Sequence, residues 1–195
     1  MEHYFTRTPT SSEEIHHIHA TLQGKNLIFE SSSGVFSKKR IDFGSRLLAE
    51  TVHPAPEAYV LDVGCGYGVL GIALSFHCQY AVLLDVNRRA CHLARKNSIL
   101  NKASNVSVVC GTPECIQPFC DVAVMNPPIR AGKKVVFSLI LSTKRCLNPG
   151  GALYLVARTK QGAKSIFAFT EDHFSSVSYA ALKGGYRVIE ACGTK

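Results

Sequence analysis

The chain has 195 residues, of which 46% are hydrophobic and 18% are charged. This length suits one domain with a substantial core, and the composition excludes a disordered chain. No apolar run approaches the twenty residues of a transmembrane helix, and the first fourteen residues contain no apolar segment typical of a signal peptide. We therefore predict a single cytoplasmic domain over residues 1–195. The formal net charge of +8 favours an acidic partner such as nucleic acid.

The first 52 residues are predicted to form a small helix and hairpin extension that packs on a core of residues 53–195. Ser11 and Glu14 fit a capping box, which predicts a helix from Ser12 to about Leu22. The segment KNLIFESSSGVFS predicts a hairpin that turns at residues 32–34. Residues 41–52 predict a short amphipathic helix, which the segment HPAPEA ends.

From Tyr59 onward, short apolar runs alternate with helical segments. The runs predict strands at 59–63, 80–86, 105–110, 121–125 and 152–157, and helices near 68–78, 88–101, 133–146 and 163–172. Strands with little alternation are buried on both faces, as in a parallel sheet covered by helices. The end differs, because SSVSYAAL, KGG and YRVIEAC predict an antiparallel hairpin at one edge of the sheet. The predicted fold is α/β and Rossmann-like.

The eight cysteines are predicted to be free, buried thiols. They lie inside apolar, periodic segments, and none forms the short C-x-x-C spacing of a zinc site. The segment HHIH at 16–19 follows the predicted helix start, so we interpret it as the first turns of that helix. We therefore predict no metal site.

A glycine-rich turn follows the first of these strands, in the segment VLDVGCGYGVLGIAL at 60–74. Gly64, Gly66 and Gly68 allow a sharp turn and let a ligand lie against bare main chain. The third glycine of a dinucleotide-binding turn would stand at position 69, which is Val. Asp62 beside the turn would repel a pyrophosphate but would suit a ligand that carries an ammonium group.

Asp85 closes the second strand, about twenty residues after the glycine turn. A carboxylate at this place can accept hydrogen bonds from both hydroxyls of a ribose, which indicates a nucleoside ligand without choosing among nucleosides. The alternative is that Asp62 and Asp85 only cap helices.

With these motifs the sequence resembles the class I S-adenosylmethionine-dependent methyltransferases. VLDVGCGYG is similar to their motif I, LLDVN to their acidic motif, and the antiparallel end to their seven-stranded sheet. The family often has an acidic residue after the third strand for the adenine amine, where this chain has Gly111 and Thr112; Thr112 would accept a hydrogen bond less strongly. The resemblance implies S-adenosylmethionine as cofactor, contacted by Asp62, Gly64, Cys65, Gly66, Gly68, Asp85, Val86, Gly111, Thr112 and Asn126.

The segment NPPI, Asn126 to Ile129, follows the fourth strand and resembles the motif of family members that methylate amino groups on planar carbons. Such a nitrogen has a delocalised lone pair and is a poor nucleophile. The Asn126 side-chain oxygen and the Pro127 carbonyl could each accept one N–H and turn the lone pair toward the methyl group. Pro127 and Pro128 fix φ, so these acceptors are preorganised. Asn126, Pro127, Pro128 and Ile129 are the predicted catalytic residues.

The longer strings NPPIRAGK, TKQGAKS at 159–165 and KGGYRV at 183–188 resemble the small-methyltransferase (MTS) family. That family includes the enzyme that methylates the 2-amino group of guanine in small-subunit ribosomal RNA. The similarity extends to GVFSKKRIDFGSRLL at 34–48, which is predicted to fold over the cleft. Position 129 is Ile, where base-flipping enzymes often have Tyr or Phe.

These features predict an N-methyltransferase that acts on an exocyclic amine of a base in RNA, with guanine N2 in ribosomal RNA favoured. The alternatives are methylation of a protein glutamine amide, methylation of a DNA amino group, and a non-catalytic RNA-binding module. A set of basic residues is predicted near the cleft mouth, where it would hold phosphates or form only an ordinary solvated surface. This set is Lys38, Lys39, Arg40, Arg130 and Lys133.

Overall fold

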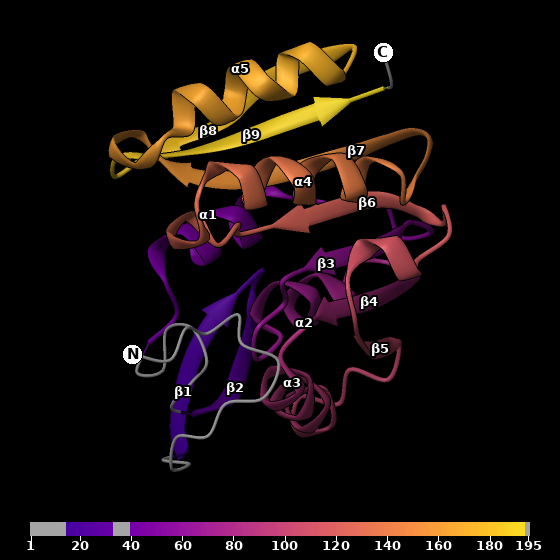
Figure 1. Cartoon of the computed structure of the whole chain (residues 1–195). Helices are drawn as coiled ribbons and strands as arrows, with labels where there is room; N and C mark the ends of the chain where they lie inside the picture. The colour runs from indigo at the N-terminus through magenta and orange to yellow at the C-terminus, as the bar shows by residue number, and fades with distance from the viewer. Residues whose placement is uncertain (1–14, 33–39, 194–195) are drawn as a thin grey trace.

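The computed structural model describes residues 15–32 and 40–193. Its main sheet has seven strands in the order β5-β4-β3-β6-β7-β9-β8 (Figure 1). The pairs β5-β4, β4-β3, β3-β6 and β6-β7 are parallel, and β9 is antiparallel to both of its neighbours. The predicted Rossmann-like sheet and its antiparallel end are therefore confirmed. The strands are β3 (Tyr59–Val63), β4 (Tyr80–Asp85), β5 (Val106–Cys110), β6 (Cys120–Met125), β7 (Leu147–Arg158), β8 (Ser176–Lys183) and β9 (Tyr186–Cys192).

Helices cover both faces of this sheet, as its doubly buried strands require (Figure 1). In β3, Val60 belongs to one hydrophobic cluster, whereas Leu61 and Val63 belong to the cluster on the other face. The first cluster lies under α1 (Phe43–Thr51), α2 (Val69–Ser75) and α3 (Arg88–Leu100). The second lies under α4 (Lys133–Lys144) and α5 (Ala163–His173). Three single-turn helices, η1 (Pro113–Cys115), η2 (Ile129–Ala131) and η3 (Thr159–Gln161), complete the elements of the described residues.

The predicted N-terminal helix is wrong, because this segment is a strand. β1 (Ile15–Leu22) pairs with β2 (Lys25–Ser32) in a separate antiparallel hairpin. The spacing of Ile15, Ile18 and Leu22 imitates a helix, yet the side chains that turn inward are those of Ile18, Ala20 and Leu22, at the two-residue period of a strand. The capping box and the other residues of 1–14 lie outside the described part of the chain.

The turn predicted at residues 32–34 falls on residues 33 and 34, which lie outside the described ranges. Ser32 is the last residue of β2. A hairpin turn that was not predicted lies at Gln23 and Gly24, between β1 and β2, and their φ angles of 50° and 71° are those of a tight two-residue turn. A Gln-Gly pair is a weaker turn signal than Asn-Gly, which is why the sequence did not single it out.

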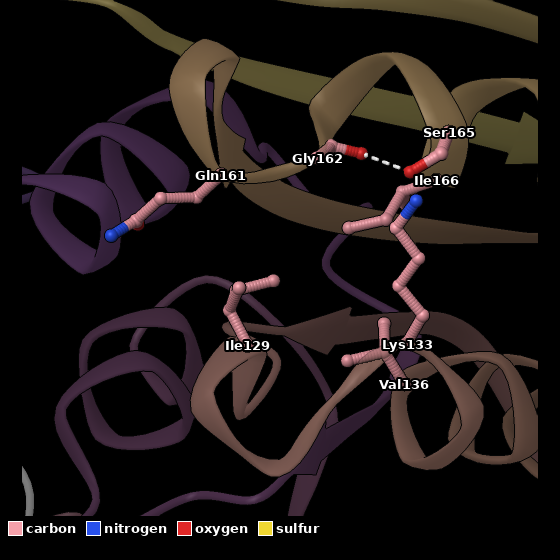
Figure 2. A pocket seen from close by; sticks show the side chains of 7 residues that line it. All are labelled: Ile129, Lys133, Val136, Gln161, Gly162, Ser165 and Ile166. Atoms are coloured by element: carbon pink, nitrogen blue, oxygen red, sulfur yellow. Dashed lines mark hydrogen bonds between the residues drawn. The ribbon is translucent and has the colours of Figure 1, made fainter.

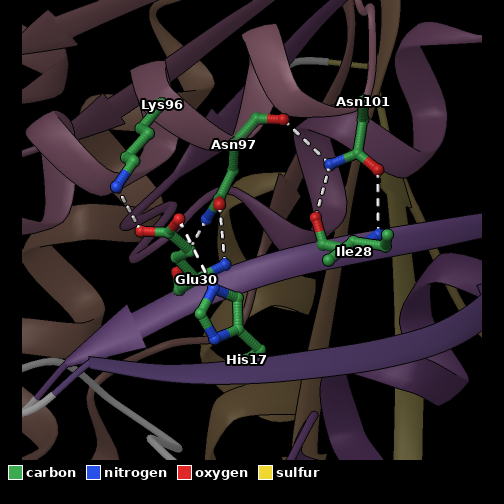
Figure 3. A network of polar contacts seen from close by, with 6 residues as sticks. All are labelled: His17, Ile28, Glu30, Lys96, Asn97 and Asn101. Atoms are coloured by element: carbon green, nitrogen blue, oxygen red, sulfur yellow. Dashed lines mark hydrogen bonds and ion pairs between the residues drawn. The ribbon is translucent and has the colours of Figure 1, made fainter.

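The hairpin is fastened to α3 by buried amide contacts (Figure 3). Asn97 is fully buried; its side chain accepts the N–H of Glu30 at 2.7 Å and donates to the Glu30 carbonyl at 2.8 Å and the Tyr67 carbonyl at 2.9 Å. Asn101 makes the equivalent pair of hydrogen bonds with the backbone of Ile28. Because Tyr67 belongs to the glycine-rich turn, the hairpin is linked directly to the segment that was predicted to bind the cofactor.

All eight cysteines are free. Five of them are buried and Cys192 is half-buried, but Cys110 and Cys115 are exposed, so the prediction of burial is wrong for these two. Among the described residues, no group of three or more His, Cys, Asp and Glu side chains is placed to hold a metal ion. None of the helices over 15–32 and 40–193 combines the length and apolarity that a bilayer crossing requires.

Candidate functional site

A cavity of about 840 Å³ lies at the carboxyl ends of the central strands, next to the switch point where β3 and β6 lead to helices on opposite faces. Ligands of open α/β sheets bind at this place, and the volume is typical of a small-molecule site. Every residue that was predicted to contact the cofactor, apart from Asp62 and Gly68, lines the cavity, and so do the four residues of the Asn-Pro-Pro-Ile segment.

The glycine-rich turn forms one wall of the cavity. Gly64 and Cys65 donate their N–H groups to the Leu84 carbonyl at 2.8 and 3.0 Å, which closes the turn against β4. Gly64 has a φ of 71°, is exposed, and would have no atom within 4 Å of an added Cβ. Main chain is therefore bare on the cavity side, as a ligand lying flat against it requires.

Asp62 lies behind this turn and does not line the cavity. It is fully buried; one carboxyl oxygen accepts the N–H of Gly71 at 2.8 Å, and the other has no hydrogen-bond partner among the described residues. Burial raises the pKa of Asp62 to about 7, the Gly71 N–H opposes this rise, and the nearby charge of Asp85 adds to it. An unpartnered carboxyl oxygen behind the turn is compatible with a cationic ligand group in front of it, and direct contact with a ligand stays a prediction.

Asp85 is half-buried at the end of β4 and faces the cavity. One of its oxygens accepts the N–H of Gly66 at 2.9 Å, and the other accepts the N–H of Asn87 at 2.8 Å. Burial raises the pKa of Asp85, and the N–H groups of Asn87, Gly66 and Val86, the last of which also hydrogen-bonds the carboxylate, act against that rise. An ionised carboxylate has about four lone-pair sites, so Asp85 can still accept a further donor from the cavity, such as a ribose hydroxyl.

The loop after β5 brings Gly111 and Thr112 to the other side of Asp85. Gly111 donates its N–H to the Asp85 carbonyl at 2.9 Å. Thr112 hydrogen-bonds the carboxylate of Glu114, whose pKa is lowered first by Ser142 and then by Thr112. A carboxylate only accepts, so the Thr112 hydroxyl is the donor there and its own oxygen remains able to accept an amine.

The Asn-Pro-Pro segment leaves β6 in an inverse γ-turn. The N–H of Ile129 donates to the Pro127 carbonyl at 2.8 Å, across Pro128 with φ −74° and ψ 74°. The Pro127 carbonyl therefore has one of its two lone pairs in use and one left for a substrate. The chain continues through η2 and Gly132 into α4, which fixes the far end of the turn.

The side-chain amide of Asn126 is held by residues that the sequence did not single out. Its nitrogen donates to the Asp42 carboxylate at 3.3 Å and to the Ser45 hydroxyl at 2.9 Å. Asp42 is also the N-cap of α1 and accepts the N–H groups of Gly44 and Ser45. The predicted placement of segment 34–48 over the cleft is thus confirmed for Asp42 and Ser45, which line the cavity.

Three more cavity residues, Arg158, Gln161 and Tyr186, come from the end of β7, from η3 and from the start of β9. The Arg158 guanidinium lies 5.0 Å from the centre of the Tyr186 ring. Burial and then Asp42, to which it is hydrogen-bonded, raise the pKa of Tyr186, against the opposing effect of Arg158. The only signal for these residues was the similarity of the surrounding strings TKQGAKS and KGGYRV.

The predicted basic residues are not all at the cavity. Arg130 is exposed and lines it, whereas Lys133 lines a smaller neighbouring pocket that shares Ile129 and Gln161 with the large one. Figure 2 shows the Lys133 side chain extending from the start of α4 toward Ser165 at the start of α5. Arg40 is exposed and outside the lining, and Lys38 and Lys39 lie outside the described residues.

The chain is similar to proteins of known family along most of its length. The model of the methyltransferase small domain family matches residues 26–190. The uncharacterized protein YbxB of Bacillus subtilis (strain 168) is 39% identical over 197 residues, which cover 97% of this chain and 98% of the relative. Ribosomal RNA small subunit methyltransferase C of Cronobacter sakazakii is 31% identical over 175 residues, which cover 87% of this chain and 50% of that protein.

Among solved structures, a Thermus thermophilus enzyme is similar in fold along nearly the whole chain. It is the 16S rRNA N2 G1207 methyltransferase (RsmC) in complex with AdoMet and guanosine, with a TM-score of 0.83, 23% sequence identity and coverage of 95% of this chain and 52% of that one. A precorrin 8w decarboxylase from Methanobacterium thermoautotrophicum follows with a TM-score of 0.65, 20% identity and coverage of 84% and 96%. The chain therefore spans about half the length of its ribosomal RNA methyltransferase relatives and nearly all of YbxB.

Proposed function

The chain belongs to the methyltransferase small domain family and is an S-adenosylmethionine-dependent methyltransferase, and on that premise we propose that it methylates an exocyclic amine of a base in RNA, namely guanine N2 in ribosomal RNA. The observation that carries the proposal is the position of Asn126 and the Pro127 carbonyl, two acceptors on the wall of the same cavity as Asp85. A donor of two N–H groups, as the guanine 2-amino group is, matches this pair of acceptors.

The residues of the cavity fit S-adenosylmethionine. Asp85 offers a carboxylate acceptor to ribose hydroxyls, Thr112 offers an acceptor to an adenine amine, and Gly64 exposes bare main chain. When bound, this cofactor supplies a methyl group on a positively charged sulfur, which keeps the electron pair of the broken S–C bond.

Asn126 and Pro127 would act on the nitrogen that receives the methyl group. With both N–H bonds directed at these acceptors, the lone pair turns out of the ring plane, toward the methyl group. Positive charge develops on this nitrogen as the new bond forms, and both acceptors then stabilise it more strongly than they stabilise the neutral amine. The extra proton is lost afterwards, so no general base is needed for the attack itself.

The relatives and the charge support RNA as the substrate. Ribosomal RNA small subunit methyltransferases C align with this chain at about 31% identity, and the formal charge of +8 favours a polyanion. Arg130 at the cavity and Lys133 beside it are exposed cations that can contact phosphates. Since ribosomal RNA and its subunits are cytoplasmic, we propose the same location for this protein.

The test combines cells and purified protein. Ribosomal RNA from cells with and without the gene is digested to nucleosides and analysed by mass spectrometry, and we expect one N2-methylguanosine to disappear. An unchanged RNA profile would contradict the proposal and direct the search to a protein glutamine amide, which has the same two N–H groups. In single-turnover assays on the identified RNA, Asn126→Ala should slow transfer by about 100–1000-fold and change S-adenosylmethionine affinity by only a few-fold.

A further inference from the structure

We propose that Asp42 and Ser45 are positioning residues that fix the side-chain amide of Asn126 in the one orientation that can accept a hydrogen bond from the target amine. The inference rests on the proposed function and adds two residues to its site, 84 and 81 positions away from Asn126 in the sequence. Neither residue needs to touch the cofactor or the substrate for this role.

An asparagine amide has two nearly equivalent ends, and only one of them can do the proposed work. The oxygen accepts an N–H from the target amine, whereas the NH₂ end would set donor against donor. A free Asn126 side chain would sample both orientations. Methyl transfer therefore requires that some neighbour distinguish the two ends.

Asp42 provides this distinction, because an ionised carboxylate only accepts hydrogen bonds. The Asp42 oxygen that faces Asn126 already receives the N–H groups of Gly44 at 2.9 Å and Ser45 at 3.3 Å, and it stands 3.3 Å from the Asn126 nitrogen. If the amide were reversed, its oxygen would face that carboxylate, which is unfavourable in a half-buried place.

Ser45 adds the second contact. Its hydroxyl, nearly buried, accepts from the Asn126 nitrogen at 2.9 Å, so both protons of the NH₂ group have acceptors, one in α1 and one at its N-cap. The Asn126 oxygen is then the end left for the cavity, which Asn126 lines. The Tyr186 hydroxyl also hydrogen-bonds Asp42, which ties the carboxylate to β9.

Asp42 has two separate contacts: it caps the N-terminus of α1, and it accepts a hydrogen bond from Asn126. A test of the second contact must leave the first in place. Ser is as good an N-cap as Asp, and its shorter side chain withdraws the oxygen from Asn126, so Asp42→Ser keeps the cap while it removes the contact with Asn126. An Asn at position 42 would not do so, because the same oxygen caps the helix and accepts from Asn126.

The experiment removes the two acceptors of the Asn126 NH₂ group one at a time and then together. We expect Asp42→Ser to fold with a melting temperature close to that of the wild type and to transfer methyl groups about tenfold more slowly in single turnover, at unchanged S-adenosylmethionine affinity. Ser45→Ala should slow transfer by a smaller factor. The double variant Asp42→Ser/Ser45→Ala leaves neither amide proton with its acceptor, and it should be slower than either single variant.

Two results would overturn the inference: a double variant as fast as the wild type, or an Asp42→Ser variant with the wild-type rate. The control is Asp121→Asn, which changes a carboxylate that bonds Tyr59 and Asn148 outside the cavity and should leave the rate unchanged.

A second measurement needs no substrate, so it tests the orientation of the Asn126 amide even if the protein does not methylate RNA. In ¹H–¹⁵N NMR spectra the side-chain amide protons of Asn126 should exchange with solvent at least tenfold faster in the Asp42→Ser/Ser45→Ala variant than in the wild type. Equal exchange would refute the orientation itself, whereas protected protons in a wild type that modifies no RNA would refute only the proposed function.

Discussion

Replacing Asp85 by Ala should separate the cofactor site from the rest of the fold. The Asp85 carboxylate accepts the N–H groups of Gly66, Asn87 and Val86, and it faces the cavity, where it can accept a ribose hydroxyl. Charge-assisted hydrogen bonds of this kind contribute roughly 1.5–3 kcal/mol, so the variant should bind S-adenosylmethionine on the order of tenfold to a hundredfold more weakly. Titration calorimetry on the purified protein measures this directly.

The same substitution also leaves these three backbone N–H groups without their acceptor, so part of any effect is a loss of stability. Asp121→Ala is the matched control, because Asp121 accepts the N–H of Tyr59 at 2.9 Å and an amide proton of Asn148 at 2.9 Å, outside the cavity. Both variants should lower the free energy of unfolding by about 1–3 kcal/mol, since each loses hydrogen bonds to a carboxylate. Only Asp85→Ala should lose cofactor affinity.

Two outcomes would refute this reasoning. If folded Asp85→Ala binds S-adenosylmethionine within twofold or threefold of the wild type, Asp85 does not hold the ribose. If Asp121→Ala loses affinity to the same extent, the weaker binding reflects a less stable sheet and not a missing contact.

Three further predictions concern the fold, the buried acid and the RNA. Asn97→Ala should lower the free energy of unfolding, measured in urea, by about 2–4 kcal/mol, because three backbone groups lose their hydrogen-bond partner at a buried position. Asn101→Ala should lower it clearly less, because water reaches the backbone groups that Asn101 contacts. The pKa of Asp62 is raised from 3.8 to about 7, so between these pH values the native state keeps a proton that the unfolded chain has lost. The free energy of unfolding should therefore fall as pH rises from about 4 to about 7. Asp62→Asn should not show this fall. Equal pH profiles for wild type and variant would contradict the buried, unpartnered carboxyl. RNA affinity should fall steeply as the salt concentration rises. Arg130→Ala should weaken binding and should reduce the slope of log affinity against log salt by about one phosphate contact. An affinity that does not depend on salt would exclude phosphate contacts.

Local signals in the sequence were enough to predict the central sheet and the cavity wall. A glycine-rich turn between an apolar strand and a helix, with Asp85 one strand further on, depends on residues that are close in sequence, and parallel strands bring their carboxyl ends to one edge. The Asn-Pro-Pro segment was located for the same reason, since two prolines at a strand end fix their own backbone. These motifs needed no knowledge of distant partners.

The sequence failed where the outcome depended on which segments pair. The stretch from Ile15 to Leu22 has apolar spacings of three and four residues and a preceding capping signal, both typical of a helix. It forms a strand because β2 satisfies its backbone groups and because Ile18 and Leu22 enter the same hydrophobic cluster as Leu48 of α1. Local preference is a weak determinant, and tertiary burial outweighs it.

The candidate site also combines features that local sequence predicts with features that depend on tertiary packing. The sequence by itself identified the residue that we propose to meet the target amine, because Asn126 carries the only suitable side-chain acceptor in its motif. Only the tertiary structure decided which way that amide points, since Asp42 and Ser45 reach it from a helix more than eighty residues earlier in the chain. A hydrogen bond between such distant residues depends on the packing of α1 against the sheet, and no spacing within the motif encodes it.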